Sequence, residues 1–152
     1  MLVWPHYLCY TNELWGGTAA GYRVVNDSNC DWGQGLKELA QWQKEHAASP
    51  LTMWYFGTDP SQFRLPIRNV QFQGLTIKDA DDLVRQVQGG YLAVSVSYLQ
   101  TGDRCSEAQK LAAQFLRGQP PVARTMTFLI YDFTHLEGGA EEAESKKVLM
   151  ND

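Results

Sequence analysis

Short apolar runs alternate with helix-patterned segments along most of the chain, and this alternation limits the possible folds more than any other feature. The expected strands span 22–25, 51–56, 91–99 and 125–133. The expected helices span 32–46, 79–87 and 106–116. Such alternation is typical of α/β proteins with a mostly parallel sheet. We therefore expect a small two-layer or three-layer α/β sandwich with a mostly parallel four-stranded sheet in the order β-α-β-α-β-α-β, in which only the last strand could lie antiparallel at an edge.

Size and composition indicate one globular domain with few unusual demands. The chain has 152 residues, of which 44% are apolar and 20% are charged, and its net charge is −4. The 13 lysines and arginines are scattered, so we expect no nucleic-acid partner. No apolar run approaches the roughly 18 residues of a spanning helix, and the first residues lack a signal-peptide pattern. Nothing in the sequence calls for a cofactor.

The chain divides into three parts by composition. Residues 1–17 are rich in aromatic side chains, are broken by Pro5 and resemble a juxtamembrane segment, although packing on the core is the alternative. Residues 18–136 carry the α/β pattern. Residues 137–152 are rich in Gly, Ala and Glu, and we expect a flexible tail there. Cys9, Cys30 and Cys105 are an odd number of cysteines without metal-ligand spacing; one pair could form a disulfide, but free thiols are favoured.

The most unusual stretch is a polar block at residues 26–35, where the first expected strand meets the first expected helix. The block reads Asn-Asp-Ser-Asn-Cys-Asp-Trp-Gly-Gln-Gly. Asp31 is a suitable N-cap, and Gln34 three residues later completes a capping-box pattern. Loops of this kind are where α/β proteins bind ligands. Capping would occupy Asp31 and Gln34 and would leave Asp27, Asn29 and Trp32 freer to contact a ligand.

A parallel sheet would bring further polar residues to the same edge as this block. The residues that follow the later strands are Thr58, Asp59, Gln100, Asp103, Asp132, Thr134 and His135. Open α/β sheets bind ligands outside the carboxyl ends of their strands. The candidate ligand-binding residues are Asp27, Ser28, Asn29, Asp31, Trp32, Gln34 and Asp59. We assign no catalytic residue and no metal ligand.

Residue chemistry leaves three explanations of this polar edge open. Carboxylates and carboxamides beside an indole suit a sugar or another polyol, Asp27 and Asp31 could help to bind a divalent cation, and all of them could simply cap and turn the backbone. A phosphate site is disfavoured because two carboxylates already stand at the helix start. Nucleophilic catalysis by Cys30 is disfavoured because no histidine lies nearby in the sequence. A hydrolase that uses paired carboxylates is a further, weaker hypothesis about function.

Several motifs also resemble a known family. They are residues 5–17 (PHYLCYTNELWGG), 21–23 (GYR), 27–34 (DSNCDWGQ) and 55–57 (YFG), with later matches at 93–96, 121–124 and 130–132. This pattern resembles the C-terminal extracytoplasmic region of bacterial membrane glycosyltransferases related to the dolichyl-phosphate-mannose protein mannosyltransferases. The resemblance covers about residues 5–135. Thr11 and Gly35 depart from it, since the family has Phe and Asp there, and residues 64–90 match no part of it.

The resemblance implies a role rather than a mechanism. The family's catalytic carboxylates lie in a loop between membrane spans, so the resemblance implies a domain on the extracytoplasmic (periplasmic) face that is not catalytic alone. Its expected partners are the membrane-embedded part of a lipid-linked-sugar-dependent glycosyltransferase, or the membrane surface, and a glycan or acceptor. The alternative from a different class is a stand-alone α/β module that binds a small polar ligand or a divalent metal.

Overall fold

Five strands form one mixed sheet in a computed structural model that describes residues 34–99 and 105–136. The strands are β1 (Leu51–Trp54), β2 (Arg68–Asn69), β3 (Tyr91–Ser95), β4 (Ala123–Arg124) and β5 (Phe128–Asp132). Their order across the sheet is β2-β1-β3-β5-β4, with β1 parallel to β2 and β3. The expected strand at 22–25, the aromatic segment 1–17 and the expected tail at 137–152 lie outside the described residues.

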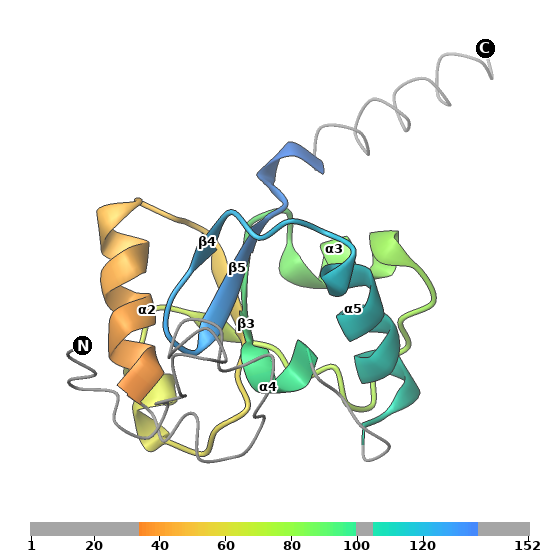
Figure 1. Cartoon of the computed structure of the whole chain (residues 1–152), viewed down its shortest axis with the longest axis horizontal. Helices are drawn as coiled ribbons and strands as arrows, with labels where there is room; N and C mark the ends of the chain where they lie inside the picture. Colours follow the sequence, from red (N-terminus) through yellow and green to blue (C-terminus); the bar gives the residue numbers. More distant parts are fainter. Residues whose placement is uncertain (1–33, 100–104, 137–152) are drawn as a thin grey trace, which may run out of the picture.

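Helices cover both faces of this sheet and make a three-layer α/β sandwich (Figure 1). The α-helices are α2 (Gln34–Glu45), α3 (Ala80–Val87), α4 (Val96–Leu99) and α5 (Glu107–Arg117), and the 3-10 helices are η5 (Pro60–Arg64) and η6 (Thr134–Leu136). Helix α2 packs on one face, and α3 and α5 pack on the other. The α/β class expected from the alternating pattern is therefore confirmed.

Two apolar clusters, one on each face, explain why the strands are continuously apolar. Along β3, Leu92 and Val94 join the cluster beneath α3 and α5, whereas Ala93 joins the cluster beneath α2. Neighbouring side chains of a strand point to opposite faces, so a strand covered on both sides is apolar at most positions; Thr52 in β1 and Ser95 in β3 are the buried polar exceptions. Leu83 of α3 and Leu39 of α2 are both fully buried in their respective clusters.

The prediction of a mostly parallel, four-stranded sheet is wrong in its details. Strand β5 lies between β3 and β4 and runs antiparallel to both. The crossover through α5 returns the chain to β4, which runs parallel to β3, as a βαβ unit requires. A tight turn then sends the chain back as β5, with the Thr125 N–H donating to the Phe128 carbonyl at 3.0 Å. The run at 125–133 is expected to be one strand, and its sequence gives no sign that its first residues form this turn.

The run at 91–99 is likewise not one strand, because its second half folds as α4. The Val96 N–H donates to the Thr127 carbonyl at 3.0 Å, just beyond the last β3–β5 pair, Ser95 and Phe128. Past that point β5 offers no further partner, so the backbone of residues 96–99 satisfies its hydrogen bonds as a helical turn. The Arg117 Nε group of α5 donates to the Leu99 carbonyl and holds this turn in place.

The helix ends on the α3–α5 face follow the sequence signals closely. Ser106 and Gln109 form a complete capping box at the start of α5, and Gly118 caps its end. Asp79 caps α3 by accepting a hydrogen bond from the Asp82 N–H. The helices expected at 79–87 and 106–116 from their apolar spacing lie within one residue of these observed bounds.

Candidate functional site

Two edges of the sheet need separate names because the strands are mixed. The carboxyl edge is the end at which β1, β2 and β3 finish, at Trp54, Asn69 and Ser95. The amino edge is the opposite end, where β3 begins at Tyr91, opposite Asp132 of β5. Ligands in open α/β sheets bind at the carboxyl edge.

Most of the ligand-binding residues predicted from the sequence lie outside the described residues. These are Asp27, Ser28, Asn29, Asp31 and Trp32, together with Gln100 and Asp103 from the wider set. Gln34 is the first residue of α2. Helix α2 begins at the carboxyl edge, because the Met126 N–H, just before β5, donates to the Glu38 carboxylate at 2.8 Å. The polar block therefore leads directly into a helix that starts at this edge.

Asp59 is the predicted site residue whose contacts the structure describes, and it has a structural role. Its Oδ1 atom accepts a hydrogen bond from the Ser61 N–H at 2.7 Å and caps η5. The backbone N–H and hydroxyl of Ser61 lower the pKa of the Asp59 carboxyl, with a smaller contribution from the positive charge of Lys37. The ionised Asp59 carboxylate therefore stabilises the start of η5, which is a structural role.

Asp132, Thr134 and His135 do not join the predicted polar edge. Strand β5 is antiparallel to β3, so its carboxyl end lies at the amino edge, beside Tyr91. Asp132 accepts hydrogen bonds from the Thr134 hydroxyl at 2.7 Å and from the Thr134 N–H at 2.9 Å. The hydroxyl contact is the larger cause of the lowered pKa of the Asp132 carboxyl. The grouping of these three residues with Asp59 is wrong because it assumed a parallel last strand.

A row of hydrogen-bonded carboxamides lies at the carboxyl edge instead, and sequence reasoning missed it. The Tyr98 hydroxyl donates to the Gln71 carbonyl oxygen at 3.1 Å, and the Gln71 amide donates to the Asn69 side-chain oxygen at 3.3 Å and to the Tyr55 backbone carbonyl at 3.2 Å. The Asn69 amide donates to Gln62. We call Gln62, Asn69, Gln71 and Tyr98 the amide row. Three of the four stand in or beside a connection that shows no periodicity, so no sequence signal groups them.

Aromatic rings flank the amide row on the side of β1. The Tyr98 ring stacks on Trp54 with centroids 4.3 Å apart and an interplanar angle of 15°. Phe56, just after β1, meets the same ring edge-on at 5.3 Å. Phe56 is 42% exposed, while Trp54 is fully buried, so one ring supports Tyr98 from the core and the other remains accessible to a ligand.

The backbone around these rings is fixed by buried polar groups. The Phe56 N–H donates to the Ser95 hydroxyl at 3.1 Å, which joins the end of β1 to the end of β3. Burial raises the pKa of the Tyr98 hydroxyl, with a further contribution from the nearby Cys105 thiol. Tyr98 therefore stays protonated and remains a hydrogen-bond donor throughout the physiological pH range. Cys105 is a free thiol, as predicted, whereas Cys9 and Cys30 lie outside the described residues.

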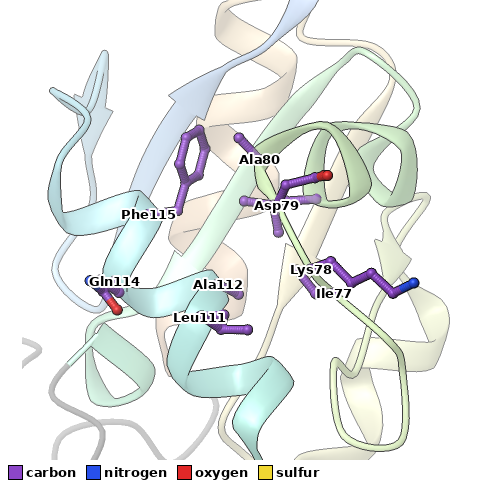
Figure 2. A pocket seen from close by; sticks show the side chains of 9 residues that line it. Ile77, Lys78, Asp79, Ala80, Leu111, Ala112, Gln114 and Phe115 are labelled. Carbon is purple, nitrogen blue, oxygen red and sulfur yellow. The ribbon is translucent and has the colours of Figure 1, made fainter.

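A groove lies between α3 and α5, and no residue of the amide row lines it. Figure 2 shows α5 on one side of this groove and residues 77–80 on the other, with walls that are mainly apolar. Its volume is about 230 Å³, below the roughly 300–1,000 Å³ typical of small-molecule sites. The carboxylate on its wall, Asp79, is already used to cap α3. The groove therefore offers less specific chemistry than the carboxyl edge.

Neither a metal centre nor a membrane span is present in the part of the chain that the structure describes. Within residues 34–99 and 105–136, no three His, Cys, Asp or Glu side chains come together in a way that could hold a metal ion. In the same residues, no helix is both long enough and apolar enough to cross a bilayer.

Comparisons with known proteins do not identify the chain. No family model, no curated protein and no solved structure matches it.

The chemistry of the carboxyl edge is that of recognition. Carboxamides and a phenol both donate and accept hydrogen bonds without carrying charge, and an exposed ring offers a flat apolar face. Such groups suit a neutral ligand with many hydroxyls.

Proposed function

We propose that this chain is an accessory domain of a lipid-linked-sugar-dependent membrane glycosyltransferase, non-catalytic on its own, which binds a glycan or acceptor at its carboxyl edge. The observation that carries the proposal is the amide row beside the exposed ring of Phe56, at the same edge where α2 begins. The motif at residues 27–34, which resembles that family, ends at the first residue of α2. The position of the motif and the chemistry of the amide row thus both favour the carboxyl edge as the binding site.

The physical basis is the pairing of amides with sugar hydroxyls. A carboxamide presents a donor and an acceptor side by side, as do the vicinal hydroxyls of a hexose. The row orients these groups in advance, because Gln71 is fixed by both Tyr98 and the Tyr55 carbonyl. Pre-orientation lowers the entropic cost of binding. The proposed location is the extracytoplasmic face of the membrane, beside the membrane-embedded catalytic part.

Glycan binding is tested by titrating the whole chain with neutral manno- and gluco-oligosaccharides and following ligand-observed NMR signals. We expect saturable binding that the substitution Gln71→Ala weakens at least fivefold. Gln114→Ala is the matched control, because Gln114 is an exposed glutamine on α5 that is remote from the row. Equal binding by both variants, or no binding by the unmodified chain, would contradict the assignment of the row.

The non-catalytic part of the proposal needs a separate assay. The whole chain is incubated with a polyprenyl-phosphate-linked sugar and a peptide or glycan acceptor, and the product is measured by mass spectrometry. We expect no transfer unless the membrane-embedded part is added. Transfer by this chain alone would overturn the accessory role.

A further inference from the structure

The hydrogen bonds of the amide row all run in one direction, and a backbone carbonyl fixes that direction. The Tyr55 carbonyl can only accept, so the Gln71 group that faces it at 3.2 Å must be the amide nitrogen. The Gln71 oxygen therefore faces Tyr98, whose hydroxyl must donate at 3.1 Å. The same Gln71 nitrogen lies 3.3 Å from the Asn69 oxygen, so the Asn69 nitrogen is turned toward Gln62.

This direction leaves N–H groups available at one end of the row. Gln71 uses both of its N–H groups, on Asn69 and on the Tyr55 carbonyl. Asn69 uses one N–H on the Gln62 oxygen, and its second N–H donates to no residue that the structure describes. The same is true of both N–H groups of Gln62. We call the side-chain nitrogens of Gln62 and Asn69 the donor end of the row.

Burial makes an empty donor end unfavourable. Gln62 is only 9% exposed, and Asn69 is half-buried. The Gln62 backbone N–H donates to the Asp59 carbonyl at 3.2 Å, which holds the residue in place on η5. Buried N–H groups in proteins are nearly always paired, because an unpaired one keeps its full desolvation cost. A ligand atom that accepts from the donor end would remove part of that cost.

The donor end favours a neutral group that accepts hydrogen bonds without donating. A carbonyl oxygen has two lone pairs and no proton, whereas a hydroxyl must also place its own proton. The ionised Asp59 carboxylate caps η5, and Lys37 lies near enough to act on it, so their opposite charges offset each other. Arg64 leaves η5 on a different side from Gln62, because a 3-10 helix has three residues per turn. A neutral carbonyl, which is cheaper to desolvate than a carboxylate, therefore fits best.

We propose that the amide row recognises an N-acetylated sugar, whose acetamido carbonyl accepts hydrogen bonds from Asn69 and Gln62. The inference rests on the proposed glycan-binding function and names its ligand class. The pyranose ring would lie against the exposed ring of Phe56, which meets Tyr98 at 5.3 Å. A sugar hydroxyl would donate to the Tyr98 oxygen at the other end of the row. A plain hexose has no acceptor-only group for the donor end.

The test compares diacetylchitobiose with cellobiose, since these two disaccharides differ in having acetamido or hydroxyl groups at the same positions. Each is titrated against the whole chain and followed by ligand-observed NMR. We expect diacetylchitobiose to bind about fivefold more tightly, because only its carbonyls can fill the buried donors. Equal affinities would overturn this inference and leave glycan binding intact. No binding of either sugar would overturn the proposed site as well.

Two further probes separate the acetamido sugar from other carbonyl-containing ligands. Cellobiouronic acid carries a carboxylate, and we expect it to bind more weakly than diacetylchitobiose. N-acetylalanine methylamide carries the same kind of carbonyl without a sugar ring, and we expect no measurable binding. If either probe binds as tightly as diacetylchitobiose, the assignment of the donor end to an N-acetylated sugar is wrong.

The substitution Asn69→Asp tests the direction of the row itself. The introduced carboxylate still accepts from Gln71, but its second oxygen can also only accept, so Gln62 must turn its nitrogen toward it and present its oxygen to the ligand. The preference for diacetylchitobiose over cellobiose should then disappear. Gln114→Glu adds the same charge at an exposed position on α5 and should keep the preference. A folded Asn69→Asp variant with an unchanged preference would overturn the inference, and the comparison on the unmodified chain decides it if the variant does not fold.

Discussion

At the scale of single residues, Tyr98 combines two roles that are usually separate. Its ring is stacked on the buried Trp54, and its hydroxyl begins the amide row by donating to Gln71. The sequence places Tyr98 in what looks like a strand, with its side chain pointing to one face of the sheet. Folding of residues 96–99 as α4 turns it toward the edge. Because residues 96–99 form a helix and not a strand, the position of Tyr98 at the edge cannot be predicted from a strand periodicity.

The substitution Tyr98→Phe tests the polar half of that role. It keeps the ring stacked on Trp54 and removes only the donor to Gln71. We expect a loss of no more than about 1 kcal/mol in the free energy of unfolding, because the lost hydrogen bond is to an exposed acceptor that water can satisfy. Urea unfolding followed by fluorescence measures this loss. No change in stability, together with unchanged oligosaccharide binding, would show that the hydroxyl takes no part in either.

Three carboxyls give the domain a predictable acid sensitivity. Asp59, Asp82 and Asp132 each accept backbone and side-chain hydrogen bonds, and these lower the pKa of each carboxyl below its usual value of 3.8. The folded state therefore binds protons less readily than the unfolded state, so stability is full above about pH 4 and is lost as the pH falls through the lower, folded pKa values.

The measurement is urea unfolding at a series of pH values from about 6 down to about 2.5. The unmodified chain should lose stability only in the acid part of this series. Asp132→Asn should flatten that dependence, because the neutral amide no longer binds a proton there. Gln114→Ala, which changes no carboxyl, is the control. A variant that keeps the full acid dependence would show that Asp132 does not contribute to it.

At the scale of elements, local signals were sufficient for helices and insufficient for strand partners. The periodic apolar face of α5 located that helix from the sequence, because amphipathic spacing depends on residues a few positions apart. The β4–β5 turn and the place of β5 between β3 and β4 depend on pairing between distant segments. Nothing within residues 125–133 encodes which neighbour the strand will choose.

The same reason explains what the sequence could say of the site. Asp59 was identified because it lies three residues after the end of an apolar run, at Phe56, which is a local feature. Gln62, Asn69 and Gln71 come together only through the short strand β2, which is two residues long and lies in a segment without periodicity.

Removal of the α5 cap gives a prediction at this scale. Ser106→Ala deletes the hydroxyl that accepts from the Gln109 N–H and breaks the capping box. The expected cost is about 1 kcal/mol of unfolding free energy, measured by urea unfolding. Gln114→Ala on the same helix is the matched control and should be neutral or slightly stabilising, since alanine favours helix. A Ser106→Ala variant as stable as the control would contradict the role of the box.

The backbone of Gly90, just before β3, packs closely against Pro50. The Tyr91 N–H donates to the Pro50 carbonyl at 2.9 Å, and a Cβ added at Gly90 would come within 2.4 Å of the same oxygen. Gly90→Ala should therefore force the backbone apart and destabilise the domain by about 1–3 kcal/mol. Gly118→Ala, where the nearest atom lies at 3.3 Å, should cost less, and thermal unfolding compares the two. Equal midpoints would contradict the close approach.

At the scale of the whole molecule, one sheet carries two apolar clusters that cannot separate without breaking strands. Trp54 of β1 belongs to the cluster beneath α3 and α5, while its neighbour Met53 belongs to the cluster beneath α2. Loss of packing on one face must therefore loosen the strands that support the other. We expect the described residues to unfold as one cooperative unit.

Two core substitutions test that coupling. Leu83→Ala on one face and Leu39→Ala on the other remove fully buried side chains, and each should cost about 2–5 kcal/mol. In both variants, unfolding curves from tryptophan fluorescence and from far-UV circular dichroism should coincide. Two separate transitions in either variant would show that the faces unfold independently.

Because β5 is antiparallel to β3, the two ends of the described fold lie at opposite edges of the sheet. Helix α2 starts at the carboxyl edge, while β5 finishes at the amino edge, next to the beginning of β3. The backbone thus enters the described fold on the side of the amide row and leaves it on the far side (Figure 1). An immobilising tag placed after residue 136 should leave the recognition edge facing outward from a sensor surface, whereas a tag placed just before residue 34 should obstruct it.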